Sequence, residues 1–198
     1  MNLVGGKYFN EGEYWCIEQH SNTNHFYDTY LPYQFHLQMV AQVYDDFKHL
    51  LPKNLITIEE EEYPNSWVLS DITHRVVRMA CWGHDLIEDT RTSYNDVSSK
   101  LGVQVADIVY AVSNEKGKNR KERANDKYYE GIRETLGAVF VKLCDRIANV
   151  QYSKMTKSRM FEMYKKENDK FMLCLGRVYQ NDGPYEEMYQ YLINLFND

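Results

Sequence analysis

Apolar residues recur at intervals of three and four along most of this chain, and this spacing constrains the fold more than any other feature of the sequence. Such intervals match the 3.6-residue period of an α-helix, whereas a half-buried strand alternates every two residues. Only the segment from Leu55 to Glu60 shows a trace of two-residue alternation. No internal repeat or Pro/Ser-rich linker divides the 198 residues. We therefore expect an all-α, single-domain helical bundle over residues 1–198.

Several of the expected helices carry their own start and stop signals. Pro32 suits the first turn of the first helix, and Ser70 and Asp71 are candidate caps for the second. Ser93 begins the third, and Asp96, three residues later, can serve its first turn. The expected helices are Tyr33–Leu51, Ile72–Asp89, Ser93–Gly102, Val105–Val112, Val139–Val150 and Tyr185–Phe196.

Composition narrows the classes of function. The net charge of 23 − 29 = −6 argues against binding to extended nucleic acid, because that affinity comes mainly from Lys and Arg on phosphates. A small phosphorylated ligand and an oligomeric assembly both stay open. No run approaches 18 apolar residues and the start lacks a signal pattern, so we expect a cytoplasmic protein without a membrane span. The four cysteines form no C-x-x-C pair, which makes a zinc knuckle or a disulfide framework improbable.

The stretch from Gly83 to Thr90 places four ionisable residues near the end of an expected helix: His84, Asp85, Glu88 and Asp89. On a helix, residues three and four apart lie on one face, so all four can point at one small volume. Three carboxylates at such short distances repel one another, and a bound cation would compensate their negative charge. The alternative is a solvated helix end with acidic residues.

Two distant residues complete a candidate metal site. Asp145 lies inside the apolar segment Val139–Val150, where a carboxylate needs a partner or a metal. Pairing with Arg146 is the alternative, although adjacent helix residues diverge by about 100°. His36 lies on the apolar face of its helix, where a histidine is more often a hydrogen-bonded core residue. With His84 and Asp85 the set offers two imidazoles and two carboxylates, which suit Mn²⁺, Fe²⁺ or Zn²⁺ better than Ca²⁺.

An upstream His, a His-Asp pair and a distant Asp, in this order on separate helices, resemble the HD superfamily of metal-dependent phosphohydrolases. Three motifs resemble the hydrolase domain of RelA/SpoT proteins in a stand-alone form, like the metazoan SpoT homologues. They are Pro32-Tyr33-x-x-His36, His84-Asp85-x-x-Glu88-Asp89-Thr90 and Val141-Lys142-Leu143-x-Asp145-Arg146-x-x-Asn149. The resemblance spans about residues 20–152; residues 153–198 are expected to form C-terminal helices of unassigned role.

The resemblance implies roles for individual residues. One metal, usually Mn²⁺ in that family, would be held by His36, His84, Asp85 and Asp145. Glu88 and Asp89 would orient or deprotonate the attacking water. The substrate would be contacted by Asn149, Arg146, Tyr27 and Lys142. The family reaction removes pyrophosphate from the 3′ position of ppGpp or pppGpp.

One departure from the family affects the expected substrate. Bacterial members of the family usually carry an Arg-Lys pair eight to nine residues before the first ligand, where this chain has Tyr27 and Asp28. Tyrosine can stack but brings no charge, and aspartate repels phosphate. The 2′-phosphate of NADPH, a nucleotidase or deoxynucleotide triphosphohydrolase activity, and a non-catalytic nucleotide-sensing module therefore stay open.

Two further groups of residues are weighed as candidates. The basic residues between Lys116 and Lys127 either grip phosphate beside the metal or form a solvated surface. The remaining histidines are expected to lie outside the site: His74 is more than one helical turn from the His84-Asp85 pair, and no partner can be identified for His20, His25 and His49.

Overall fold

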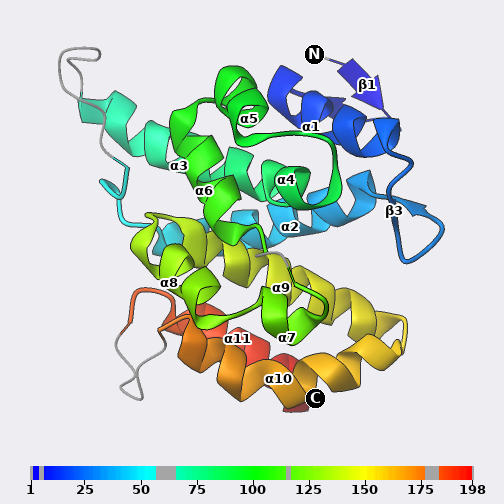
Figure 1. Ribbon diagram of the computed structural model, residues 1–198. Helices are drawn as coiled ribbons and strands as arrows, with labels where there is room; N and C mark the ends of the chain where they lie inside the picture. Colours follow the sequence, from blue (N-terminus) through cyan, green and yellow to red (C-terminus); the bar gives the residue numbers. More distant parts are fainter. Residues whose placement is uncertain (1, 5–6, 57–65, 115–116, 177–182, 198) are drawn as a thin grey trace.

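The computed structural model describes residues 2–4, 7–56, 66–114, 117–176 and 183–197. Most of these residues form helices that pack as a bundle (Figure 1). The strands are β1 (Asn2–Val4), β2 (Lys7–Phe9), β3 (Phe26–Tyr27) and β4 (Leu31–Pro32). The helices are α1 (Glu11–Asn22), α2 (Gln34–Phe47), the 3-10 turn η1 (Lys48–Leu50), α3 (Ser66–Gly83), α4 (Leu86–Asp89), α5 (Tyr94–Leu101), α6 (Val103–Val112), α7 (Arg120–Arg123), α8 (Asp126–Glu134), α9 (Ala138–Met155), α10 (Arg159–Cys174) and α11 (Glu186–Asn197). Two short antiparallel hairpins accompany the helices, one before α1 and one between α1 and α2.

Helix α9 lies at the centre of the bundle and contacts α2, α3, α6, α8, α10 and α11. The apolar face predicted from the sequence is fully buried in it: Phe140, Leu143, Ile147 and Val150 have no exposed surface. Burying side chains of this size contributes about 1.5–3 kcal/mol each to folding. In Figure 1, α1 and α5 lie at one end of the molecule, and α10 and α11, in orange and red, lie at the other. The described fold confirms the predicted all-α class.

The helix expected from Ile72 to Asp89 is predicted wrongly at its start and is interrupted near its end. Helix α3 begins at Ser66, so Ser70 and Asp71 lie within it and do not cap it. It ends at Gly83, and a turn at His84 and Asp85 separates it from the single turn α4. The His84 ring nitrogen Nδ1 lies 2.9 Å from the carbonyl oxygen of Cys81, so this side chain satisfies one of the carbonyls left unpaired at the helix end.

Capping signals predict α5 correctly. The Ser93 side chain accepts a hydrogen bond from the Asp96 N–H, and the Asp96 carboxylate accepts one from the Ser93 N–H. Gly102 follows with φ = 99°, a conformation that glycine adopts without steric cost. The spacing did not predict α1, α8 and α10. Of the segment Leu55–Glu60, the first two residues form bends and the rest lies outside the described residues.

Two smaller expectations concern helix α2 and the cysteines. Helix α2 begins at Gln34, so Pro32 lies in β4, two residues before the helix, and not in its first turn. The four cysteines are free; three are buried and Cys174 is half-buried. Within the described parts of the chain, no helix has the length and apolar character needed to cross a membrane.

Candidate metal centre

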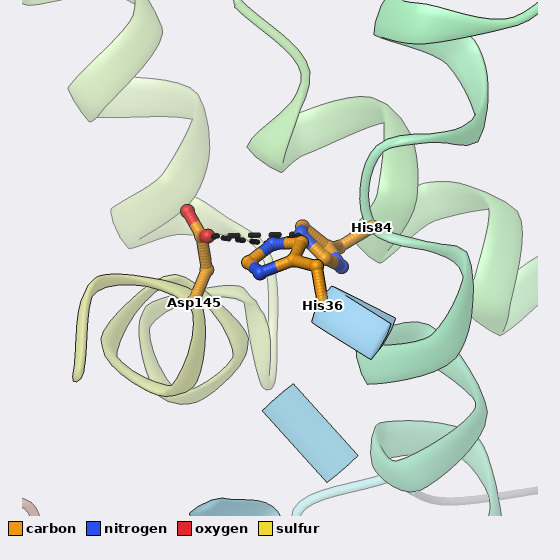
Figure 2. A group of neighbouring side chains, drawn as sticks. All are labelled: His36, His84 and Asp145. Carbon is orange, nitrogen blue, oxygen red and sulfur yellow. Dashed lines mark hydrogen bonds and ion pairs between the residues drawn. The ribbon is translucent and has the colours of Figure 1, made fainter. Parts of the chain in front are cut away.

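Three segments that are distant in the sequence bring two imidazoles and a carboxylate to one point. Figure 2 shows His36 from α2, His84 from the turn after α3, and Asp145 from α9 facing one another. The Nε2 atoms of His36 and His84 are 3.2 Å apart. The Oδ1 atom of Asp145 lies 3.4 Å from His36 Nε2 and 3.7 Å from His84 Nε2. All three groups offer a ligand atom within 4.8 Å of the others, a spacing that one metal ion can bridge.

Asp85 lies beside this group, as predicted. Its Oδ2 atom is 2.9 Å from His84 Nε2 and 3.7 Å from His36 Nε2. The contact between His84 Nδ1 and the Cys81 carbonyl favours the tautomer with the proton on Nδ1, which leaves the Nε2 lone pair for a metal. All four predicted ligands therefore converge, and both histidines are buried.

The electrostatics of these groups favour a bound cation. Burial lowers the pKa of the His84 imidazole, but Asp85 and Asp145 outweigh burial and raise this pKa to about 9. Burial raises the pKa of the Asp85 carboxyl, yet the neighbouring His84 holds it below its usual value. Negative charge in this buried space is thus compensated by a proton on an imidazole. Because metal ligands must give up such protons, a divalent cation can take the proton's place. Two imidazoles and two carboxylates form a donor set that fits Mn²⁺, Fe²⁺ or Zn²⁺.

The carboxylates of Glu88 and Asp89 face different surroundings. Both Glu88 oxygens accept hydrogen bonds from the Asn114 side-chain amide at 2.8 Å, and Arg123 Nη1 lies 3.8 Å away. Asp89 faces Tyr33 and His25 instead, at 3.5 Å and 3.9 Å. Burial, followed by the charges of Asp85 and Glu88, raises the pKa of Asp89 to about 7. The Asp89 carboxyl therefore holds a proton near neutral pH more readily than an ordinary aspartate does.

A cavity of about 450 Å³ opens over the candidate metal centre. Its walls include predicted ligands, Glu88 and residues from α8, α9 and α10. Helix α10 belongs to the segment to which the sequence assigned no role, and it supplies one side of the cavity. The residues that line the cavity include His36, Asp85, Glu88, Arg123, Lys142, Asp145, Arg146, Asn149, Tyr164, Glu167 and Lys170.

Two of the predicted substrate-contacting residues also hold Asp145 directly. Lys142 Nζ lies 3.0 Å from Asp145 Oδ2. The Asn149 side-chain amide donates to Asp145 Oδ1 at 2.5 Å, while its oxygen accepts from the Tyr27 hydroxyl at 2.9 Å. The Tyr27 ring stacks on His36, with ring centroids 4.7 Å apart. Lys142 and Asn149 therefore line the cavity and contact Asp145, whereas Tyr27 contacts Asn149 and His36.

Arg146 contacts helix α10. Its guanidinium carbon lies 4.7 Å from the ring centre of Tyr164 and 4.1 Å from that of Phe171, and Nη1 is 3.6 Å from Glu167. The planar group joins α9 to α10 at the wall of the cavity.

The structure adds two histidines that sequence reasoning left outside the site. The His25 ring packs on Tyr33 and lies near Asp89, and His20 Nδ1 is 3.0 Å from His25 Nδ1. Their partners follow from the β3–β4 hairpin, which helical spacing does not reveal. His49 pairs with Glu187 and His74 with Tyr44, outside the site as expected.

The structure places only some of the basic residues between Lys116 and Lys127 at the cavity, and Asp28 of the Tyr27-Asp28 pair makes a contact within the protein. Arg123 lines the cavity, whereas Lys116 and the side chains of Arg120 and Lys121 lie outside the described residues. Asp28 accepts a hydrogen bond from the Tyr152 hydroxyl at 2.7 Å.

Comparisons with known proteins place this geometry in context. No model of a protein family matches the chain. Guanosine-3′,5′-bis(diphosphate) 3′-pyrophosphohydrolase MESH1 of Drosophila melanogaster is 31% identical over 80 residues, and the Mus musculus and Homo sapiens proteins of that name are 34% identical over 80 residues. Each match covers 40% of this chain, and the chain spans only 45% of the length of these relatives.

A solved structure extends the similarity to the whole fold. It is that of a metazoan ortholog of SpoT that hydrolyzes ppGpp and plays a role in starvation responses. The two structures agree with a TM-score of 0.57 at 18% sequence identity, over 95% of this chain and 97% of the other. These similarities confirm the predicted resemblance to stand-alone RelA/SpoT-type hydrolases and the predicted helical HD-type fold.

Proposed function

We propose that this protein is a metal-dependent phosphohydrolase that removes the 3′-pyrophosphate of ppGpp, pppGpp or a closely related nucleotide. The observation that carries this proposal is the convergence of His36, His84, Asp85 and Asp145 beneath a cavity that Glu88 borders. The similarity to proteins named as guanosine-bis(diphosphate) pyrophosphohydrolases supports this substrate class.

The four converging residues would hold one divalent ion, with Mn²⁺ as the first expectation and Fe²⁺ or Zn²⁺ as alternatives. Such an ion, when bound, lowers the pKa of a water from 15.7 to about 7 and stabilises charge that develops on the phosphoryl group. The Lys142 ammonium and the Asn149 amide keep the Asp145 carboxylate oriented for this role. Contacts of this kind typically change metal affinity about 10–100-fold.

Glu88 would act as the base that orients and deprotonates the attacking water. Its carboxylate is held by the Asn114 side-chain amide, and Arg123 lies 3.8 Å away. A positioned base contributes about 10²–10⁴-fold to such a reaction. Asp89 faces Tyr33 and His25, and burial with the charges of Asp85 and Glu88 raises its pKa to about 7, so we assign the role of base to Glu88 rather than to Asp89.

The cations of the cavity wall would bind the remaining phosphates of the nucleotide. Arg123 approaches from α7, while Arg146 and Lys170 border the side formed by α9 and α10. The positions of the family's Arg-Lys pair are occupied by Tyr27 and Asp28, which bond to Asn149 and Tyr152. Since this pair offers no positive charge, an alternative nucleotide such as NADPH, attacked at its 2′-phosphate, is the second candidate substrate.

An assay of product release tests the proposal. The purified protein is incubated with saturating Mn²⁺ and with ppGpp, NADPH or deoxynucleoside triphosphates, and phosphate and pyrophosphate are measured. Pyrophosphate from ppGpp is the expected result, and phosphate from NADPH identifies the second candidate. Deoxynucleotide turnover alone would indicate another branch of HD hydrolases. Tight nucleotide binding without any product would contradict the enzyme and identify a sensing module.

Two substitutions separate metal binding from proton transfer. Asp145→Ala is expected to abolish Mn²⁺ binding and turnover together. Glu88→Gln is expected to keep Mn²⁺ affinity within about threefold and to lower kcat by about 10²–10⁴-fold. Glu187→Gln, at an exposed glutamate that pairs with His49, is the matched control and should change neither quantity. Full turnover by Glu88→Gln would contradict the role of Glu88 as base.

A further inference from the structure

Tyr33 connects the candidate metal centre to a layer of aromatic rings outside it. Its hydroxyl donates a hydrogen bond to Asp85 Oδ2 and lies 3.5 Å from Asp89 Oδ2. The Oδ2 atom of Asp85 is also the atom that lies 2.9 Å from His84 Nε2. The side chain is 8% exposed and stands at the start of α2, one helical turn before His36.

Two imidazole rings hold the Tyr33 ring in place. His25 lies 4.0 Å and His20 lies 4.3 Å from it between ring centres, each tilted by 21°, which is a stacked arrangement. The two histidines contact each other through their Nδ1 atoms at 3.0 Å. His20 is buried at the end of α1, and His25 precedes β3, so two separate parts of the chain pack on one ring.

We infer that Tyr33 is a positioning residue for the metal centre: its hydroxyl fixes the rotamer of Asp85, and the stacked rings of His20 and His25 fix the hydroxyl. The inference rests on the proposed function, because it takes Asp85 as a metal ligand. A carboxylate that is free to rotate about its Cα–Cβ bond loses side-chain entropy when it binds an ion. A hydrogen bond that holds it beforehand removes part of this cost.

The hydroxyl and the ring make separable contributions. A purely structural Tyr33 would act through its buried ring, and the loss of the hydroxyl alone would leave the metal centre unchanged. A positioning Tyr33 acts through the hydroxyl on Asp85, so its removal weakens metal binding while the ring keeps the packing intact.

Tyr33→Phe tests the hydroxyl, and Tyr94→Phe is the matched control. Tyr94 also donates to a carboxylate, Asp107 Oδ1 at 2.8 Å, but on the exposed surface between α5 and α6. The Kd for Mn²⁺ alone is measured by titration calorimetry, with the electron paramagnetic resonance spectrum of the bound ion and a thermal melt of each metal-free variant. We expect Tyr33→Phe to raise the Kd about 10–100-fold and to alter the spectrum, and Tyr94→Phe to leave both unchanged.

A second pair of variants tests the stacked rings. His25→Ala removes the ring that packs on Tyr33 and is expected to raise the Kd for Mn²⁺ several-fold. His25→Phe restores a ring in the same place and is expected to recover most of this loss. If the metal-free Tyr33→Phe variant melts far below the wild type, the comparison of His25→Ala with His25→Phe tests the inference in its place.

The outcomes distinguish the inference from the proposed function. Wild-type protein that binds no divalent ion contradicts the metal centre itself. Wild-type protein that binds Mn²⁺, with a Kd that Tyr33→Phe changes less than twofold, overturns the positioning role and leaves the metal centre standing. His25→Phe that binds no better than His25→Ala overturns the role of the rings.

Discussion

At the scale of single residues, Asp89 lies between two acidic side chains on one side and two aromatic side chains on the other. Asp85 and Glu88 repel its ionised form, and burial adds to this effect. The Tyr33 hydroxyl and the His25 imidazole stand on its other side. The pKa of this carboxyl is about 7 in the folded protein, against a usual value of 3.8. Between these two values of pH, the folded state therefore holds a proton that the unfolded chain has already lost.

Asp89→Asn therefore changes how the stability of the metal-free protein depends on pH. A raised carboxyl pKa means that wild-type stability falls as the pH rises from about 4 to about 7, whereas the amide does not titrate. Across this window we expect the free energy of unfolding of the variant to rise relative to that of the wild type by up to about 1 kcal/mol. The difference stays this small because solvent screens a part-exposed carboxylate. Urea denaturation at pH 5 and pH 8, with chelator present, measures this difference. An equal difference at both values of pH would contradict the raised pKa.

Single residues also show where sequence reasoning stops. His36 and Asp145 could be singled out because a polar group in an apolar helical stripe needs a partner. His20, His25 and Asn114 gave no such signal, since each finds its partner across a turn or between helices. Their roles depend on the β3–β4 hairpin and on the distance between α4 and α6, which periodicity does not encode.

At the scale of elements, the turn between α3 and α4 decides the geometry of the site. The apolar spacing continues through it, as Leu86 is fully buried, so the pattern predicted one uninterrupted helix. The chain instead leaves the helix at Gly83, and His84 and Asp85 face the imidazole of His36 and one another. By contrast, α5 and α9 were predictable from a reciprocal cap and from a fully buried face.

The contact between α9 and α10 leads to a prediction about stability. Arg146→Ala removes a guanidinium that stacks on Tyr164 and Phe171 and pairs with Glu167. We expect a loss of about 2–3 kcal/mol in the free energy of unfolding, because the packing of a buried guanidinium on two rings is lost together with its pairing to the part-exposed Glu167. Arg159→Ala, an exposed arginine at the start of α10, should cost less than about 0.5 kcal/mol. Equal losses in the two variants, measured by chemical denaturation, would contradict the role of this contact.

At the scale of the whole molecule, the site depends on the complete bundle. The residues of the candidate metal centre come from α2, the turn after α3, and α9, and α9 packs on helices from both ends of the molecule (Figure 1). An unfolded chain keeps these groups far apart on average, so it binds an ion much more weakly than the folded protein.

Metal ions should therefore stabilise the fold. At a free Mn²⁺ concentration of about 100 times the Kd, we expect the free energy of unfolding to rise by about 2.7 kcal/mol. Asp145→Ala should show no such increase at the same concentration. Denaturation with and without Mn²⁺ checks this, and an equal increase in both proteins would show that the ion acts elsewhere.

Helix α10 forms one wall of the cavity although it lies beyond the segment whose motifs resemble RelA/SpoT-type hydrolases. A compound bound only at His36, Asp85 and Asp145 would leave this wall uncovered. A compound that also reaches Tyr164 and Lys170 would contact both sides of the cavity, so its affinity would depend on how α10 packs against α9.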